Sequence, residues 1–185
     1  LVDNSIAANA TNIAIHVIQD VKGEVTVFIC DNGTGMDEAA LMNAMRYGSS
    51  KQADPMRLGK FGLGLKTAST AFCRQLEVTT RTADGYTGCA CWDLDTIAKT
   101  NKWSLEIKEP NKTVLKLLGT VSNGSGTVVA WRKTDRFFPT KYKNLNGLPA
   151  KKALDKMLMG LSEHLGLTFQ RFIDGTTKKG GPALK

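Results

Sequence analysis

Apolar and polar positions divide the first part of the chain into two helices around a pair of strands. Residues 1–10 carry apolar positions at helical spacing, whereas residues 12–19 and 25–30 are rich in β-branched side chains that alternate or run continuously. A short glycine-containing turn separates the two extended stretches, so they are predicted to pair as a hairpin. Asp37 precedes a second apolar stripe and is a suitable N-cap for a helix over residues 38–47.

A series of short strands is predicted after residue 74, separated by stretches rich in glycine, asparagine and proline. The predicted strands are residues 76–81, 86–94, 103–108, 113–117 and 127–133. Runs of strands follow helices without strict alternation, which is typical of an α+β fold. We therefore expect a two-layer sandwich, with helices on one face of a mixed, mostly antiparallel sheet.

The chain changes character after Pro139. Leucine, methionine and phenylalanine recur at helical spacing over residues 151–173, which predicts an amphipathic helix with a break at Gly166. We therefore expect a main domain over residues 1–138 and a C-terminal extension over residues 139–185.

Composition is typical of a protein with a single core. Hydrophobic residues make up 42% of the 185 residues and charged residues 23%. No apolar run approaches the roughly 20 residues that span a bilayer. Among the four cysteines, Cys89 and Cys91 lie two apart without a second pair, which argues against a zinc site. Reduced, packed thiols of a cytoplasmic protein are the expectation.

The net charge of +8 lies in the last third of the chain. Residues 132–185 hold 12 Lys and Arg against four Asp and Glu, whereas the charges of residues 1–131 balance. A solvated basic face is the simpler explanation, because aromatic residues are not interleaved with the basic ones. The alternative is a surface for nucleic acid or an acidic protein.

Three glycines within six positions of the stretch 57–69 lead into a helix-favouring run. Such a turn aims unpaired N–H groups and a partial positive charge at one point, which suits a phosphate. The stretch is not a P-loop, because Leu65 separates the last glycine from Lys66, and the glycine spacing differs from a dinucleotide fingerprint. On its own, this stretch is equally well explained as the closely packed start of a helix.

A second motif, Asp-Asn-Gly-Thr-Gly-Met, begins at Asp31 directly after the apolar stretch 25–30. It is compatible with an ordinary turn after a strand. It also presents a carboxylate at a strand end, beside Gly33 and Gly35, which leave room for a flat ligand. In the N-terminal helix, Asn4 offers a neutral oxygen ligand.

In order and spacing, these three segments resemble the N, G1 and G2 boxes of the GHKL superfamily of gyrase, heat-shock chaperone, histidine kinase and MutL ATP-binding domains. Residues 126–129, Gly-Thr-Val-Val, resemble the fourth box. The resemblance covers residues 1–133. The sequences of these motifs are more similar to those of the MORC, chaperone and type-II topoisomerase branches than to those of sensor kinases. It implies the Bergerat fold, with ATP and Mg²⁺ as ligands and nucleotide-dependent dimerisation in many members.

The resemblance also implies a role for particular residues. Asn4 would coordinate Mg²⁺, and Asp31 would read adenine, because an ionised carboxylate only accepts hydrogen bonds and so suits an exocyclic amine. Met36 would supply an apolar wall, and main-chain N–H groups of the glycine stretch would bind the phosphates. The implied ATP-binding residues are Asn4, Ala8, Asp31, Gly33, Gly35, Met36, Lys51, Gly59, Lys60, Phe61, Gly62, Leu63, Gly64 and Thr127.

The general base is expected outside this sequence. In the resembled family it is a glutamate one turn before the magnesium-binding asparagine, a position immediately before Leu1. Asp3 points about 100° around the helix from Asn4 and is not assigned that role. Residues 48–58 occupy the place of the ATP lid. Lys66 could be either a phosphate contact or an ordinary surface lysine.

Three functions remain open from the sequence. The first is an ATPase that couples Mg-ATP binding and slow hydrolysis to lid closure. The second is a histidine-kinase catalytic domain that transfers the γ-phosphate to a histidine on another segment, because neither His16 nor His164 lies in a suitable context. The third is a non-hydrolysing nucleotide sensor with a basic face that binds a partner.

Overall fold

The computed structural model describes residues 1–46, 64–138 and 142–175, which form six strands and seven helices. The strands are β1 (Ile13–Gln19), β2 (Val25–Asp31), β3 (Cys73–Arg81), β4 (Thr87–Asp93), β5 (Glu106–Lys108) and β6 (Gly126–Thr134). The helices are α1 (Val2–Ala7), α2 (Glu38–Met45), α3 (Gly64–Thr70), α4 (Leu94–Thr100), α5 (Lys112–Val121), α6 (Leu148–Thr168) and α7 (Gln170–Ile173).

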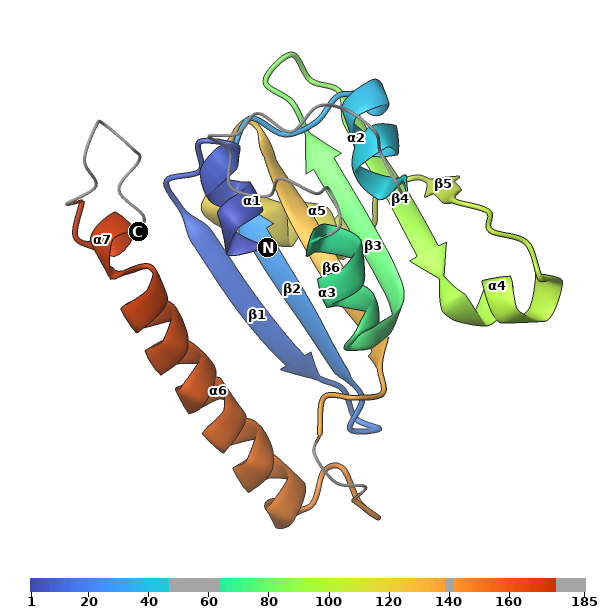
Figure 1. Ribbon diagram of the computed structural model, residues 1–185, viewed down its shortest axis with the longest axis vertical. Coiled ribbons are helices and arrows are strands. Elements are labelled where there is room, and N and C mark those ends of the chain that lie inside the picture. The colour runs from blue at the N-terminus through green and yellow to red at the C-terminus, as the bar shows by residue number, and fades with distance from the viewer. Residues whose placement is uncertain (47–63, 139–141, 176–185) are drawn as a thin grey trace.

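The strands form one sheet in the order β1-β2-β6-β3-β4-β5, and every pairing is antiparallel (Figure 1). The α+β architecture predicted from the sequence is therefore confirmed. The last strand in sequence, β6, lies in the middle of the sheet between β2 and β3. Its register sets Thr127 opposite Asp31 on one side and opposite Thr80 on the other. Two segments almost one hundred residues apart thus meet at one end of the sheet.

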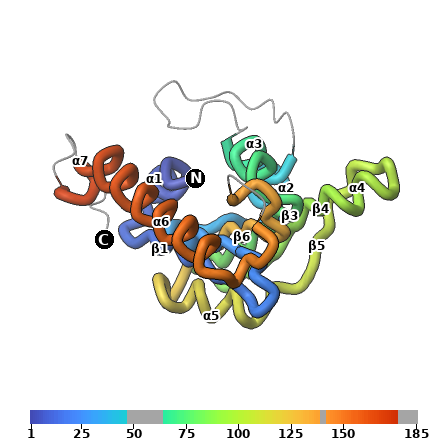
Figure 2. Tube along the Cα trace, turned by 90° about the horizontal axis from the view of Figure 1, so that it is seen from below, coloured from blue at the N-terminus to red at the C-terminus, as the bar shows by residue number. Residues whose placement is uncertain are grey.

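Each face of the sheet has its own apolar core, because side chains alternate along a strand. On one face, Val27 and Ile29 of β2 belong to the same cluster as Leu41 of α2 and Leu65 of α3. On the other face, Phe28 packs with buried residues of β6 and α5. Figure 2 shows the sheet from below, with α5 on the side opposite to α1, α2 and α3, so helices cover both faces rather than the single face expected from the sequence.

One predicted strand is wrong. Residues 113–117 form part of helix α5, in which the Asn111 side chain caps the start by accepting from the Thr113 N–H at 2.8 Å. Val114 and Leu118, one helical turn apart, are both fully buried against the sheet. Their packing outweighs the strand preference of the β-branched residues in this short run.

The helices also differ from the predictions, most clearly in α4 and α6. Helix α4 begins at a cap provided by Asp93 and was not predicted. Helix α6 begins at Leu148, before the predicted start, with a proline in its first turn, where a missing N–H costs nothing. It continues through Gly166, which was expected to break it, because a single glycine costs a helix only about 1 kcal/mol.

The C-terminal extension is joined to the turn between β1 and β2. The Gln19 side chain donates to the Leu145 carbonyl at 2.9 Å, and the Asn146 side chain donates to the Val21 carbonyl at 2.7 Å. Helix α6 then buries Ala150 and Leu154, whereas most of its remaining side chains are exposed. Among the described residues, no helix is both long and apolar enough to cross a membrane.

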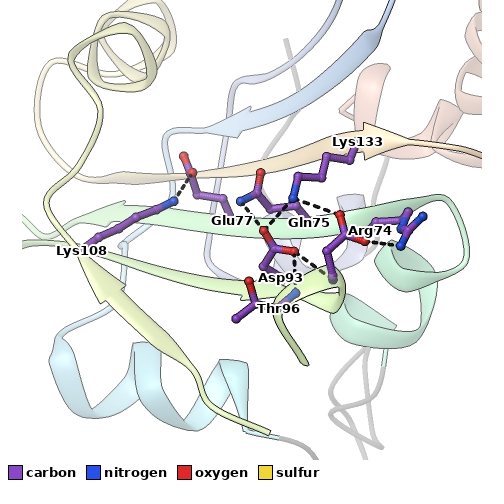
Figure 3. Close-up of polar contacts among 8 residues, drawn as sticks. Arg74, Gln75, Glu77, Asp93, Thr96, Lys108 and Lys133 are labelled. Atoms are coloured by element: carbon purple, nitrogen blue, oxygen red, sulfur yellow. Dashed lines mark hydrogen bonds and ion pairs between the residues drawn. The ribbon is translucent and has the colours of Figure 1, made fainter. Parts of the chain in front are cut away.

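A buried carboxylate joins three strands on the face that carries α5. Glu77 on β3 accepts from Lys108 of β5 at 3.0 Å (Figure 3). It also accepts from Arg132 of β6 at 3.3 Å, and its side chain is only 4% exposed. Burial alone would raise the pKa of Glu77. The hydrogen bond from Lys108 and the nearby Arg132 charge outweigh it, so the pKa is lowered.

Candidate functional site

A cavity of about 540 Å³ opens at the end of the sheet where β2 and β6 meet. Helix α1 and the segment after β2 form two of its sides, and residues Ala44 and Leu65 bring in α2 and α3. The predicted ATP-binding residues that line it are Asn4, Ala8, Asp31, Gly35, Met36 and Thr127. Residues from three of the sequence motifs therefore surround one space.

Asp31 is the buried carboxylate of this cavity. It is the last residue of β2 and is only 6% exposed. Its two oxygens accept from the Ser5 hydroxyl and from the Gly33 N–H, each at 2.9 Å. Burial raises the pKa of Asp31, and the hydrogen bonds from Gly33, Ser5 and the Thr127 backbone offset only part of that rise. The site therefore holds an acceptor in an environment that disfavours its charge.

Two glycines are required here by close packing. Gly35 has φ +71°, and a Cβ at this position would lie 2.0 Å from the Arg81 carbonyl oxygen. At Gly33 a Cβ would lie 2.8 Å from both the Cβ and the carbonyl oxygen of Ala8. Gly33 thus reaches the site through its N–H to Asp31, and its small size lets the loop approach α1.

Helix α1 contributes a polar side chain at the opening. Asn4 is exposed and lines the cavity together with Leu1 and Ala8, which lie one turn away on either side. Asp3 is absent from the lining, in agreement with its angular position on the helix. Among the described residues, no cluster of three His, Cys, Asp or Glu side chains could hold a metal ion.

Two polar residues of the site were missed by the sequence analysis. Ser5 holds Asp31, as described above. Thr80 of β3 accepts from the Met36 N–H at 2.8 Å and lies 3.4 Å from the Thr127 hydroxyl, so it connects the loop after β2 to β6. The sequence pattern could have placed Thr80 on the face of the sheet that lines the site, because Thr80 follows Leu76 and Val78 at two-residue spacing along the strand.

The glycine stretch is described only at its end. Lys51, Gly59, Lys60, Phe61, Gly62 and Leu63 lie outside the described residues. Gly64 begins α3 without a left-handed backbone, and within the described part of the chain nothing lies within 4 Å of a Cβ built on it. Lys66 is not at the surface, because it is 1% exposed.

A second cleft, of about 500 Å³, lies at the opposite end of β2. The cations among its described lining residues are already paired: Lys133 donates to Asp93 at 2.8 Å and to Asp95 at 3.1 Å, and Arg74 pairs with Asp95 (Figure 3). The cavity at Asp31 is the better candidate for a ligand, because its carboxylate retains acceptor capacity beyond the contacts above.

Comparison with known proteins supports the resemblance. The family model described as "Histidine kinase-, DNA gyrase B-, and HSP90-like ATPase" matches residues 1–127. A mouse protein, "ATPase MORC2B", is 36% identical over 73 residues, which cover 37% of this chain and 7% of the mouse protein. The aligned part is thus a small share of that relative.

Proposed function

Because the chain belongs to the histidine kinase-, DNA gyrase B- and HSP90-like ATPases, we propose that residues 1–138 form a Mg²⁺-dependent ATP-binding domain that hydrolyses ATP. Residues 139–185 would be a basic extension of this domain. The observation that carries the proposal is the buried Asp31 carboxylate, which lines a cavity together with residues from three of the four family motifs.

The chemistry of Asp31 favours adenine over guanine. An ionised carboxylate accepts hydrogen bonds and donates none, so it binds the exocyclic amine of adenine and repels the keto oxygen of guanine. Ser5 and Gly33 fix its orientation before the ligand arrives. Because the carboxylate is removed from water, a wrong base would leave its remaining lone pairs without a donor, which costs more than a lost contact in solvent.

Asn4 is the residue that would hold Mg²⁺. Its amide oxygen is a ligand of the type that Mg²⁺ accepts, and the phosphates and water would supply the others. The bound ion would neutralise charge on the phosphates. Asn4 is exposed at the cavity, which leaves its oxygen accessible to a ligand. The general base for hydrolysis is proposed to precede Leu1, and closure of residues 48–58 over the nucleotide is proposed to accompany binding.

Transfer of the phosphoryl group to a histidine within the described residues has less support. His16 pairs with Phe28 across β1 and β2, on the sheet face that α5 covers, away from the cavity. His164 is exposed on α6. Transfer of the γ-phosphate to a histidine on another segment, a nucleic-acid or acidic-protein partner for residues 132–185, a nucleotide-dependent homodimer and a non-hydrolysing sensor remain predictions from the sequence.

Calorimetric titration with Mg-ATP, Mg-ADP and Mg-GTP tests the proposal. We expect binding of the two adenine nucleotides and none of GTP, and we expect Asp31→Asn to remove binding while the far-UV spectrum stays unchanged. Asp155→Asn, the same chemical change on the exposed side of α6, serves as the matched control and should bind normally. Unchanged ATP affinity in Asp31→Asn would show that the pocket is assigned wrongly.

A further inference from the structure

Helix α3 carries a buried lysine that reaches to another helix. Lys66 is 1% exposed, and its ammonium donates to two backbone carbonyls at the end of α2: Ala44 at 3.0 Å and Arg46 at 2.7 Å. A lysine is almost never fully buried without such partners. Burial lowers the pKa of Lys66, whereas the two acceptors favour its charged form.

The two acceptors lie where α2 needs a cation. The last carbonyls of a helix have no N–H donors within the helix, and they carry the negative end of its dipole. Helix α2 has no basic residue of its own in the last turn. Lys66 supplies that charge from a neighbouring helix through charge-assisted hydrogen bonds, which are stronger than neutral ones.

The two helices joined by Lys66 both border the cavity at Asp31. Ala44 of α2 and Leu65 of α3 line it. Ala44 accepts the hydrogen bond from Lys66, and Leu65 directly precedes Lys66 in the chain. The helices pack on different strands, α2 on β4 and α3 on β3, and Figure 2 shows them next to each other on the same side of the sheet. Their relative position is therefore set partly by the contact between them.

We propose that Lys66 is a positioning residue for the nucleotide, holding the end of α2 against the start of α3 so that two cavity walls are fixed before the ligand binds. This inference rests on the proposed function of the cavity. Fixing the walls in advance removes an ordering cost from binding. Lys66 acts through Ala44 and Leu65, since its ammonium is directed at backbone carbonyls of α2.

Hydrogen exchange of the ligand-free chain tests the contact itself. Lys66→Met keeps the length of the side chain but has no donor. We expect faster exchange of the amides at the end of α2, around residues 44–46, with β2 and β6 unchanged. Lys66→Arg, which can donate to both carbonyls, should restore slow exchange. Equal exchange in Lys66→Met and the unaltered chain would overturn the proposal. If Lys66→Met does not fold, Lys66→Gln is measured in its place, because its shorter, uncharged side chain cannot make charge-assisted hydrogen bonds to both carbonyls.

Calorimetric titration with Mg-ATP and with adenosine tests the consequence for the ligand. We expect Lys66→Met to weaken both by about tenfold, the effect of roughly 1.4 kcal/mol, because both need the same walls. Val114→Ala, a cavity-forming change under α5 on the opposite face, controls for a general loss of stability and should bind normally. Affinity lost for ATP alone would indicate a direct phosphate contact and would overturn the proposal, as would unchanged affinity for both ligands.

The two arms separate this inference from the proposed function. If the unaltered chain binds neither ATP nor adenosine, the proposed function fails, and with it the role of Lys66 toward a nucleotide. The exchange experiment would still decide whether Lys66 holds α2 to α3. If the unaltered chain binds both ligands and Lys66→Met also binds them normally, only the role of Lys66 fails.

Discussion

At the scale of single residues, the site keeps an acidic group where its charge is costly. Asp31 could be found from the sequence, because it follows a strand and precedes two glycines. The hydrogen bond from Ser5 to Asp31 could not be found in this way, because the sequence shows only that Ser5 lies on the same side of a helix as Leu1 and Ala8. The burial of Lys66 could not be found in this way, because its partners are backbone carbonyls of a segment twenty residues earlier. A side chain that bonds to the backbone of a distant segment leaves no pattern in the local sequence.

The raised pKa of Asp31 predicts a pH dependence of binding. The folded-state pKa lies above the ordinary value of 3.8, so Asp31 takes up its proton at a higher pH than an ordinary aspartate. A protonated carboxyl loses an acceptor for the adenine amine. Adenosine affinity should therefore be constant near neutral pH and should fall as the pH is lowered through the raised pKa.

Titration calorimetry at a series of pH values measures this dependence. Adenosine is the preferred ligand, because the terminal phosphate of ATP titrates near pH 6 and would add its own dependence. Asp155→Asn should follow the same curve as the unaltered chain. A constant affinity down to the ordinary aspartate range would contradict the raised pKa.

At the scale of elements, strands were easier to predict than the short helices between them. Strands β2, β3, β4 and β6 follow long alternating or apolar runs that are buried on both faces. Helix α5 could not be distinguished from a strand by residues 113–117 alone. Its identity depends on the Asn111 cap and on burial of Val114 and Leu118 against a sheet that the local sequence does not reveal.

The Glu77 ion pairs predict a pH-dependent contribution to the strength of the sheet. Glu77→Gln removes the charge that Lys108 and Arg132 face, and we expect a loss of about 2 kcal/mol at neutral pH. This is below the 3–5 kcal/mol of a fully buried pair, because both cations are partly exposed. The pKa of Glu77 is lowered from its ordinary value of 4.5. Its contribution is therefore fully present above 4.5 and is lost as the pH falls through the lower, folded-state pKa.

Urea unfolding measures this contribution. At neutral pH the Glu77→Gln midpoint should lie below that of the unaltered chain, and the difference should shrink in acid. Glu109→Gln, on the exposed segment after β5, is the matched control and should change little at either pH. A difference that stays constant with pH would mean that the amide change disturbs packing rather than charge.

At the scale of the whole molecule, antiparallel pairing brings distant motifs together. Local patterns predicted the strands, but they did not predict that β6 lies between β2 and β3. The resemblance to the family assigned the segments at Asp31 and Thr127 to the same site, but the order of the strands comes from the structure alone. Part of the basic charge also has a structural use. Arg132 pairs with Glu77, and Lys133 pairs with Asp93 and Asp95, so these charges are balanced within the sheet.

Ligand binding should stabilise the whole domain in a manner that depends on Mg²⁺. A ligand that binds only the folded state, at about one hundred times its Kd, adds about 2.7 kcal/mol of stability. For a chain of this size each kcal/mol raises Tm by about 2–4 °C, so saturating Mg-ATP should raise Tm by roughly 5–10 °C. Chelating Mg²⁺ should remove much of the gain with ATP and none of the gain with adenosine, which has no phosphate to share an ion with Asn4.

A thermal scan of the unaltered chain and of Asn4→Ala distinguishes the contributions of metal and base. In Asn4→Ala the adenosine shift should be retained, because Asp31 and its partners are unchanged. The extra shift with Mg-ATP should be reduced, because the side-chain oxygen that would hold the ion is gone. Equal Mg-ATP shifts in both chains would remove Asn4 from the metal site while leaving the adenine site at Asp31 in place. Loss of the adenosine shift would instead mean that Asn4 shapes the cavity itself.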